Sequence, residues 1–472
     1  MHKALPIIIT LTLLPSCMEQ QKMENIIIIG GGLMGSATAW ELSAAGEDVL
    51  LLEQQDSIYT YGSSQGEARI SRSLGPKDDL FSWLQQTSVA EVQKLLLYLN
   101  KVDGPGTHSM EDIYTTSPVT YLMYTSQKAI IDSLLDDQAD SHEVAVGSAA
   151  AKEKFGMAVP DSMTMIREYK PYSGTLNPRV LISKMQQGTL KKENRIQYHS
   201  NVTRLTKKEG YYELEVTDTH SGKTTLLRAK KVVSAAGPYT GPLLKDVAPY
   251  MDTLIDTKRL FLAFFKPTKA AWEALGPEGQ RRLTEFYPVA DLDPEIYYSM
   301  IEDYDTDGRP IIKVGGHFKR TDIQNLDEVW KLPVTQAEQD WARNRTLNYL
   351  QEIGIPMTAK DFIFHKGYSC VYSLTTSEIP LVTPAVINGQ PDPSLVMVAG
   401  LSGVGAKGAL AYGLLAANQL MGKTVDPKMY QKALRLMGPE RLEKDLFDLD
   451  KKQAKKVAGL DVFEKGFLFK GN

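Results

Sequence analysis

Four residues near the start of the chain have the types and spacing that bind a phosphate-rich cofactor. The segment Gly30–Gly35 reads GGGLMG and fits the pattern G-x-G-x-x-G. Gly30 allows a tight turn, Gly32 lets the backbone approach a pyrophosphate, and Gly35 lets a helix pack against a strand. Glu53 follows about 20 residues later, where a carboxylate can accept hydrogen bonds from both ribose hydroxyls. These residues predict a dinucleotide site, but they do not choose between FAD and NAD.

The elements around this turn come in the order that such a site needs. Asn25–Ile29 is short, apolar and β-branched, which predicts a buried parallel strand. A helical pattern then runs through Ala45 and ends at Gly46. Asp48–Leu52 predicts a second buried strand, which Glu53 closes. The sequence therefore predicts a βαβ unit, with the positive end of its helix facing the pyrophosphate.

Two later apolar runs, Lys231–Ala235 and Leu395–Ala399, are predicted to return to the same sheet as parallel strands. Much of the middle of the chain is richer in aromatic residues and alternation, which is typical of an antiparallel sheet. Other strand-like segments are Thr115–Tyr124, Tyr211–Val216, Arg259–Lys266 and Ile311–Val314. The predicted fold class is α/β plus α+β, with a Rossmann-like cofactor domain and an inserted substrate domain that has a mixed or antiparallel sheet.

The overall composition excludes several classes of protein. The chain has 472 residues, 43% of them hydrophobic, which is too apolar for a disordered protein. Its formal charge of -4 combines both signs, so no nucleic-acid partner is expected. No apolar run reaches the roughly 18 residues that suggest a membrane-spanning helix. The two cysteines, Cys17 and Cys370, are too few for a disulfide framework, and no metal site is expected.

The first residues match a bacterial lipoprotein signal peptide better than a part of the fold. A basic start, Met1–Lys3, precedes the mostly apolar run Ala4–Leu14. Cleavage before Cys17 would leave its nucleophilic sulfur to carry a lipid, which predicts a membrane-anchored protein of the cell envelope. Met23 stands directly before the first strand, however, and translation from it would give a cytoplasmic enzyme. Both interpretations stay open.

Four further segments resemble motifs of the monomeric sarcosine oxidase family, whose relatives include N-methyltryptophan oxidase and pipecolate oxidase. Gly62–Arg72 is similar to the family's G-S-x-x-G-x-x-R-x-x-R loop, and Lys313–His317 is similar to its K-x-G-x-H strand. Cys370–Ser373 resembles its C-x-Y-[ST] element, and Ala399–Lys407 resembles its A-G-x-S-G-x-G-x-K segment. Together with the glycine turn, the five matches fall in family order over nearly the whole chain.

The resemblance implies that the dinucleotide is FAD. The Cys370 sulfur would bond covalently to the flavin 8α carbon, which requires a thiolate and hence a nearby positive charge. Arg69 would lie beside the flavin ring, and backbone N–H groups at Gly403 and Gly405 would face its negative charge. Val202 is also assigned to the FAD-binding residues. Taken alone, Cys370 would be an inert buried thiol and Arg69 a solvated surface residue.

The resemblance also implies roles on the substrate side. Arg72 and Lys407 would hold a substrate carboxylate and so fix its α-carbon over the flavin. Lys313 would help oxygen react, because a fixed positive charge stabilises superoxide as it forms. Tyr298 and His317 would line the amine pocket, where His317 could favour the neutral amine. The alternative for His317 is an ordinary core histidine.

The resemblance therefore implies an enzyme that oxidises the C–N bond of a small amino acid, expected to be a secondary or N-methyl one, while O₂ becomes H₂O₂. Three alternatives remain: a dehydrogenase that passes electrons to a quinone or carrier, a desaturase of a cyclic imino acid, and a non-enzymatic binding protein. The chain departs from the family at Ser64, Gln65 and Ala68, so the particular substrate stays open. We expect a monomer.

The motifs also divide the chain into expected domains. A discontinuous FAD-binding domain comprises residues 23–110, 175–250 and 366–425. The substrate domain comprises residues 111–174 and 251–365. Residues 1–22 form the leader, and residues 426–472 form a charged, helical C-terminal extension whose role the sequence does not show.

Overall fold

The structure is a computed structural model that describes residues 22–57, 60–74, 78–127, 132, 141–292, 295–375 and 377–457. Two large sheets dominate it, and a third, three-stranded sheet accompanies them. The leader predicted for residues 1–22 lies outside the described residues, apart from Lys22. Among the residues that are described, no helix is long and apolar enough to cross a membrane.

The first sheet is built around β1 (Met23–Ile29), which pairs in parallel with β2 (Val49–Leu52) and β12 (Thr224–Ser234). Ile26 to Ile29 are each at most 5% exposed. A strand buried on both faces has this continuous apolar character, so the predicted buried parallel strand is confirmed. β9 (Arg195–Gln197) extends the sheet in parallel beyond β2.

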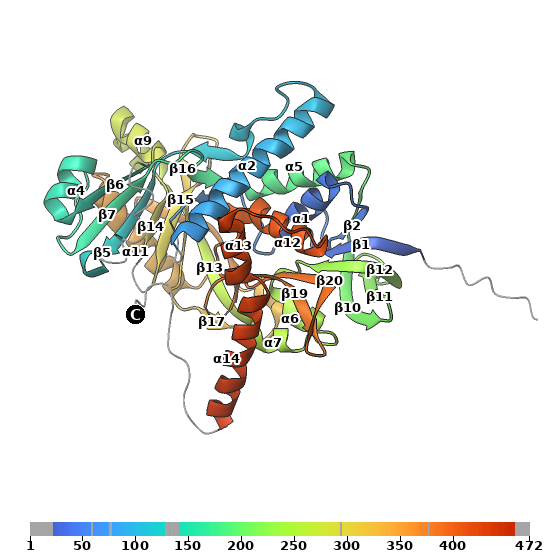
Figure 1. The fold of residues 1–472 in the computed structure, drawn as a ribbon. Coiled ribbons are helices and arrows are strands. Elements are labelled where there is room, and N and C mark those ends of the chain that lie inside the picture. The colour runs from blue at the N-terminus through green and yellow to red at the C-terminus, as the bar shows by residue number, and fades with distance from the viewer. Residues whose placement is uncertain are drawn as a thin grey trace, which may run out of the picture.

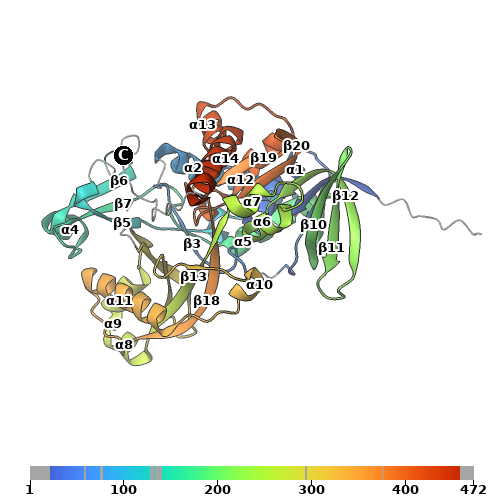
Figure 2. The same cartoon turned by 90° about the horizontal axis from the view of Figure 1, so that it is seen from below.

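The far edge of β12 is shared by two partners. Its last residues pair in parallel with β20 (Gln390–Ala399), which confirms that both predicted runs return to the first sheet. Its first residues pair with an antiparallel arm, as Figure 2 shows. The remaining strands of this sheet are β10 (Ser200–Lys208) and β11 (Tyr211–Asp218) of the arm and β19 (Leu381–Ile387), which pairs with β20.

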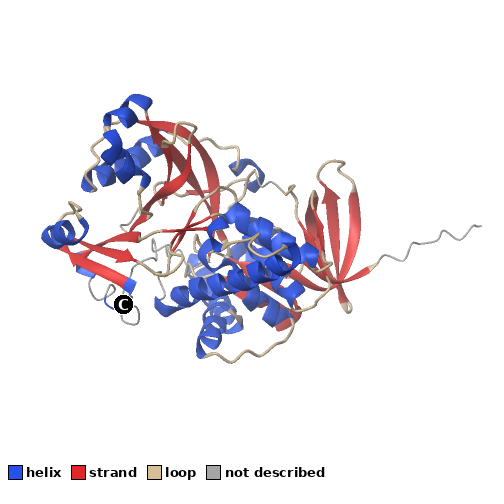
Figure 3. Ribbon diagram, turned by 90° about the horizontal axis from the view of Figure 1, so that it is seen from above, coloured by secondary structure: helices blue, strands red, loops and turns tan. Residues whose placement is uncertain are grey.

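Helices cover both faces of the first sheet, because successive residues of a buried strand point to opposite sides. Ile26 and Ile28 pack in one core with α12, whereas Ile27 and Ile29 pack in another with α6 and α7. In the view of Figure 3, a cluster of helices lies between the arm and the second sheet. The helices of this part are α1 (Leu33–Ala44), α2 (Asp78–Asp103), α5 (Pro178–Lys191), α6 (Thr240–Leu244), α7 (Tyr250–Leu254) and α12 (Ala409–Leu420).

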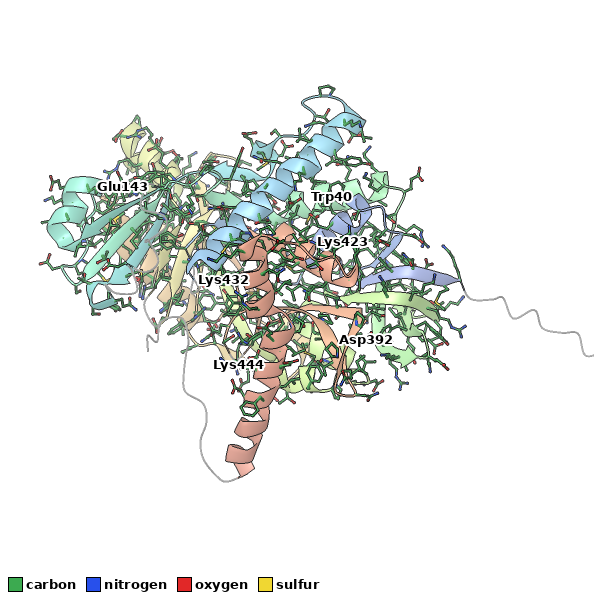
Figure 4. All side chains as sticks on the ribbon, viewed as in Figure 1. Trp40, Glu143, Asp392, Lys423, Lys432 and Lys444 are labelled. Carbon is green, nitrogen blue, oxygen red and sulfur yellow. The ribbon has the colours of Figure 1, made fainter. Side chains whose placement is uncertain are left out.

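The second sheet is antiparallel except where β14 pairs in parallel with β5. Its strands are β5 (Val119–Tyr124), β6 (His142–Val146), β7 (Met163–Glu168), β13 (Asp256–Pro267), β14 (Val289–Asp291), β15 (Tyr297–Tyr304), β16 (Pro310–Gly316), β17 (Thr321–Asp322) and β18 (Phe362–Leu374). The helices of this part are α4 (Gly147–Phe155), α8 (Lys269–Ala274), α9 (Gly276–Thr284), α10 (Leu326–Val329) and α11 (Gln336–Glu352). The mixed or antiparallel second sheet is thus confirmed. Glu143 of β6 and Asp392 of β20 lie in these two different parts of the molecule (Figure 4).

One predicted strand is wrong in its extent. The segment Thr115–Tyr124 forms two strands, β5 and the short β4 (Tyr114–Thr116), which pair in different sheets. Pro118 lies between them, and its lack of an N–H group suits the break. β4 joins β3 (Arg69–Ser71) and β8 (Gly174–Leu176) in the small sheet, which therefore carries Arg69.

β18 links the two parts of the molecule. It pairs along its whole length with β13, and the boundary expected between residues 365 and 366 falls inside it. After β18 the chain returns to the first sheet through β19 and β20. Cys370 therefore lies in the strand of the second sheet from which the chain returns to the first sheet.

Residues 426–457 of the C-terminal extension contain two helices, α13 (Lys428–Met437) and α14 (Pro439–Val457), and residues 458–472 lie outside the described residues. Figure 4 marks them by Lys432 and Lys444. Tyr430 and Met437 are buried in the core beside α12, and Leu442 is buried in the core beside α7. The first part of the extension, as far as Leu442, therefore packs into the fold, although the sequence predicted only a charged helical tail.

Candidate FAD and substrate site

The turn after β1 has the close contacts that its glycines were predicted to allow. Gly30 has a φ of +96°, and a Cβ atom there would lie 2.6 Å from the carbonyl oxygen of Ala235. A Cβ atom at Gly35 would lie only 1.7 Å from the carbonyl oxygen of Gly30. Gly32 stands directly before α1, where the first N–H groups have no acceptor within the helix, and the Leu33 N–H donates to the Ser64 hydroxyl at 3.2 Å. The turn can bring backbone donors close to a phosphate.

Glu53 follows β2 and faces the same turn. Its carboxylate accepts the backbone N–H of Gly31 at 2.6 Å and that of Gln55 at 2.9 Å. Burial raises the pKa of this carboxyl, although these N–H groups act in the opposite direction. Glu53 is thus held between the glycine turn and the chain beyond β2, where an acid that binds ribose is expected.

One cavity of about 580 Å³ joins the glycine turn to the second sheet. Of the residues predicted for the site, it is lined by Gly30, Gly32, Glu53, Arg69, Arg72, Val202, Tyr298, Lys313, His317, Cys370, Gly403, Gly405 and Lys407. Gly35 does not line it, because it packs beneath the turn against Gly30. Residues more than 300 positions apart in the sequence are therefore brought to one space.

Arg72 and Lys407 converge on a single acceptor. The Arg72 guanidinium donates to the carbonyl oxygen of Leu74 at 2.8 Å, and the Lys407 ammonium donates to the same oxygen at 3.4 Å. Burial, and secondly the nearby Arg72, lower the pKa of Lys407 well below its usual value. A bound carboxylate would favour the protonated form of Lys407, and the two side chains, which share one acceptor, could then hold that carboxylate together.

Glu168, which the sequence analysis did not identify, places a buried carboxylate near Arg72 and Lys407. Glu168 is fully buried and accepts hydrogen bonds from the Ser73 N–H at 2.9 Å and the Tyr121 hydroxyl at 2.6 Å. The Tyr121 ring in turn lies 5.5 Å from the Arg72 guanidinium carbon. Burial opposes ionisation of Glu168, but His142, Ser173 and Tyr121 outweigh it and lower its pKa to about 2. An ionised Glu168 therefore balances part of the charge of Arg72 and Lys407.

Lys313 is almost completely buried in β16, with 1% of its side chain exposed. Its ammonium donates to the carbonyl oxygen of Ala68 and to the carboxylate of Glu302, a residue that no motif contains. Arg69, in the loop beside it, donates to the carbonyl oxygen of Ala68 at 2.8 Å and to that of Ser63 at 3.0 Å. Both cations are thus fixed at the wall of the cavity.

Tyr298 and His317 form the part of the wall expected to receive the amine. Gly315 makes room for Tyr298, because a Cβ atom there would lie 2.4 Å from the Tyr298 hydroxyl. Burial, with a smaller effect of Arg320, lowers the pKa of His317 to about 3. The imidazole is therefore neutral, and its ring lies 5.8 Å from that of Tyr372. A neutral imidazole can exchange a hydrogen bond with an amine.

Cys370 lies in β18, 7% exposed, and the charge expected near it is present. Burial raises the pKa of its thiol to about 11, while Arg69, Arg259 and Lys313 act in the opposite direction. The positive charge that was expected near Cys370 is therefore present, while burial keeps the thiol protonated near pH 7. The loop that contains Gly403 packs closely against Tyr372, because a Cβ atom at Gly403 would lie 2.6 Å from the Tyr372 ring.

Gly405 lies at the start of the helical segment that was expected after the loop Gly403–Gly405. It directly precedes a short 3-10 helix at Ala406–Gly408, and α12 follows. Among the described residues, no group of three or more potential metal ligands comes together.

A mixed sheet with a glycine turn after its central parallel strand, opening into a cavity shared with a second sheet, fits an enzyme that binds a dinucleotide cofactor. Residues 25–419 match the family model of the FAD dependent oxidoreductases, called DAO. The chain belongs to this family. It is an FAD-dependent oxidoreductase that acts on the C–N bond of an amino acid.

Curated relatives agree with the family. The chain is 23% identical over 402 residues to a protein from Arabidopsis thaliana named probable sarcosine oxidase, covering 84% of this chain and 88% of that one. It is also 23% identical over 401 residues to an N-methyl-L-tryptophan oxidase of Yersinia pestis, covering 83% and 94%.

Solved structures share the fold. L-proline dehydrogenase from P. horikoshii matches with a TM-score of 0.64 and 16% identity, covering 90% of this chain and 99% of that one. Iminodiacetate oxidase from Chelativorans sp. BNC1 matches with a TM-score of 0.62 and 16% identity, covering 88% and 99%.

The residues present fit FAD. The cavity runs from Glu53, past the glycine turn, to Cys370 and Lys407, so it can take an extended dinucleotide. Glu53 and the turn would hold the ribose and pyrophosphate, and Arg69 and Lys313 would lie near the flavin ring. When bound, FAD accepts a hydride from the substrate and passes two electrons to an acceptor.

Proposed function

We propose that this enzyme oxidises a small secondary or N-methyl amino acid to an imine and passes the electrons to O₂. The amino acid loses a hydride from carbon and a proton from nitrogen, and O₂ gains two electrons and two protons to become H₂O₂. Water then hydrolyses the imine. The observation that carries the proposal is the convergence of Arg72 and Lys407 on one oxygen in the cavity that Lys313 and His317 also line.

The side chains divide the work between binding and proton control. Arg72 and Lys407 hold the carboxylate, which fixes the position of the α-carbon. Neutral His317 can donate its ring N–H to the lone pair of the amine nitrogen, which favours the unprotonated amine, from which hydride is lost more readily. The Lys313 ammonium stabilises the negative charge that develops on oxygen.

The first test is a screen of secondary amino acids for peroxide release. Sarcosine, other N-methyl amino acids, proline and pipecolate are supplied to the FAD-loaded enzyme in air. Peroxide formed together with imine-derived carbonyl supports the proposal. Turnover with a quinone-like dye and no peroxide would assign a dehydrogenase, and no turnover with any of these secondary amino acids would reject the proposed substrate class.

Removing either substrate cation is expected to weaken carboxylate binding. Arg72→Ala or Lys407→Ala each deletes one charge-assisted hydrogen bond, which costs about 1.5 to 3 kcal/mol. This corresponds to roughly one to two orders of magnitude in the Kd of a simple carboxylate inhibitor. The change in the flavin absorbance spectrum during inhibitor titration measures it. Equal oxidation of amines that lack a carboxylate would contradict the assignment.

We also propose that Cys370 bonds to the flavin 8α carbon. A C–S bond would replace the thiol S–H bond and one C–H bond of the 8α methyl group, while two electrons and two protons pass through the flavin to its acceptor. Cys370 lines the cavity beside Arg69 and Lys313, which supports this proposal. Because the thiol is neutral, we expect the link to form faster at alkaline pH.

The covalent link predicts a simple result. Acid precipitation of the wild-type protein is expected to leave yellow colour in the pellet, whereas Cys370→Ala is expected to release all its flavin. Absorbance of pellet and supernatant measures this. Complete release of flavin from the wild-type protein would overturn the link without affecting the proposed reaction.

For location, we propose an envelope lipoprotein anchored through Cys17, with a cytoplasmic enzyme starting at Met23 as the alternative. The support lies in the sequence of residues 1–17 alone. Membrane fractionation and mass spectrometry of the N-terminus after expression in a bacterial host decide between them. A lipid-modified Cys17 supports the anchor, and an intact protein starting at Met23 rejects it.

A further inference from the structure

The buried carboxylate of Glu302 contacts both Lys313 and the loop beside it. The Glu302 side chain is 4% exposed and forms an ion pair with Lys313. Glu302 also accepts the backbone N–H groups of Glu67 at 2.7 Å and of Ala68 at 3.0 Å. The Lys313 ammonium donates to the carbonyl oxygen of Ala68 as well. Glu302 therefore ties the lysine of β16 to the loop that carries Arg69.

The backbone on both sides is shaped to present this carboxylate. β15 and β16 pair with a register shift between Ile301 and Asp303, so Glu302 is the extra residue of a bulge. Bulges redirect a side chain and are common beside active sites. In the facing loop, Gly66 has a φ of +100°, and a Cβ atom there would lie 2.9 Å from a Glu302 carboxylate oxygen. The second glycine of the loop motif thus leaves room for Glu302.

The groups around Lys313 shift its pKa in opposite directions. Burial and the neighbouring Arg69 lower the pKa of the Lys313 ammonium to about 8, while Glu302 raises it. The Glu302 carboxyl has a lowered pKa, because Lys313 and the loop N–H groups outweigh its burial. Burial raises the pKa of the other titratable groups that face this cluster, Tyr298, Tyr368 and Cys370. Glu302 is therefore the anion that balances two cations.

We propose that Glu302 is a positioning residue that keeps Lys313 protonated and directed at the flavin end of the cavity. This inference rests on the oxygen-dependent reaction proposed above. In that reaction O₂ takes up the two electrons and two protons that the amino acid gave up, so negative charge develops on oxygen before both protons arrive. Without Glu302, Lys313 would face Arg69 in a buried site and would lose its proton more readily.

The test is the pH profile of reoxidation by O₂, measured by stopped flow on the FAD-loaded, substrate-reduced enzyme. In the wild type, the rate is expected to fall as pH rises through about 8, because the Lys313 cation is lost above its pKa. In Glu302→Gln, the fall is expected at a pH lower by about 1 to 3 units, the effect of one adjacent opposite charge. At pH 8 the variant is then at least about fivefold slower, the value for a shift of 1 unit, and at acidic pH it approaches the wild-type rate.

A second measurement follows the lysine without turnover. A lysine that titrates beside the flavin is expected to give a pH-dependent change in the absorbance of bound oxidised FAD. Its midpoint should shift downward in Glu302→Gln and the change should vanish in Lys313→Met. Glu302→Asp keeps the charge and is expected to titrate near the wild-type midpoint. Asp303→Asn, the exposed neighbouring acid, is the matched control and should leave the profile unchanged.

The outcomes separate this inference from the proposed function. Wild-type profiles in Glu302→Gln by both measurements, with slow reoxidation in Lys313→Met, would overturn the role of Glu302 and leave the oxidase intact. Fast reoxidation in Lys313→Met would reject the oxygen role, while the spectral titration would still report whether Glu302 holds the lysine proton. If Glu302→Gln does not bind FAD, a midpoint in Glu302→Asp equal to that in the wild type supports the inference. A Glu302→Asp protein that binds FAD but shows no pH-dependent change in its absorbance contradicts it.

Discussion

Replacing Lys313 with methionine is expected to slow the reaction of the reduced enzyme with O₂ by about two to three orders of magnitude. Removing one fixed charge from a site without water costs about 3 to 4 kcal/mol, as for loss of an oxyanion-hole donor, and each 1.36 kcal/mol is about tenfold in rate. Methionine has a similar length and fills the buried position without a charge. Reduction by substrate is expected to change much less, since Arg72 and Lys407 still hold the carboxylate.

Stopped-flow measurement of both half-reactions checks this result. Lys313→Met also leaves Glu302 without its ion-pair partner, and a buried unpaired charge is costly in itself. The double variant Lys313→Met/Glu302→Gln removes both charges and controls for this effect. Slow reoxidation in both variants assigns the loss to the ammonium. Equal damage to the two half-reactions would instead indicate a general disturbance of the cavity.

Replacing Gly35 with alanine is expected to abolish FAD binding and to destabilise the protein. A Cβ atom there would lie 1.7 Å from the Gly30 carbonyl oxygen, a backbone atom that can move only if the turn moves. Overpacking of this kind costs about 1 to 3 kcal/mol, occasionally more, and we expect the upper end. Flavin content after purification and thermal unfolding of the apoprotein measure the two effects.

Gly46→Ala is the matched control for this prediction. Gly46 follows the same helix and has a φ of +87°, but a Cβ atom there would meet nothing within 4 Å. Backbone strain without a clash is expected to lower stability by about 1 kcal/mol and to leave FAD bound. A Gly35→Ala protein that keeps its flavin would show that the turn tolerates a wider approach of helix and strand.

Much of the first sheet could be predicted because short sequence patterns mark its strands and turns. The run of isoleucines in β1 and the glycines that follow it define strand, turn and helix without reference to the rest of the chain. The cations Arg72, Lys313 and Lys407 could be predicted because each lies within a motif. Their convergence on one cavity depends on strands that meet from distant parts of the chain, and the motif order made that expectation possible.

Glu302 and Glu168 could not be predicted, for physical reasons. No short sequence pattern marks the bulge at Glu302. The alternation of residues along β15 therefore does not predict to which side of the strand the Glu302 carboxylate points. Glu168 ends an ordinary strand, and only the folded structure shows that its acceptors are filled by Ser73 and Tyr121. The neutrality of the Cys370 thiol likewise depends on how deeply the fold buries it, which a nearby arginine in a motif does not reveal.

The direction of β1 determines which side of the enzyme a tether would hold. The strand enters at Met23, which is 38% exposed, and ends at the glycine turn. Seven residues of strand separate these points by about 20 Å. Figure 1 shows β1 entering on the side of the molecule that lies away from the second sheet. Attachment to a bead or electrode through Met23 would therefore leave the second sheet on the side away from the support.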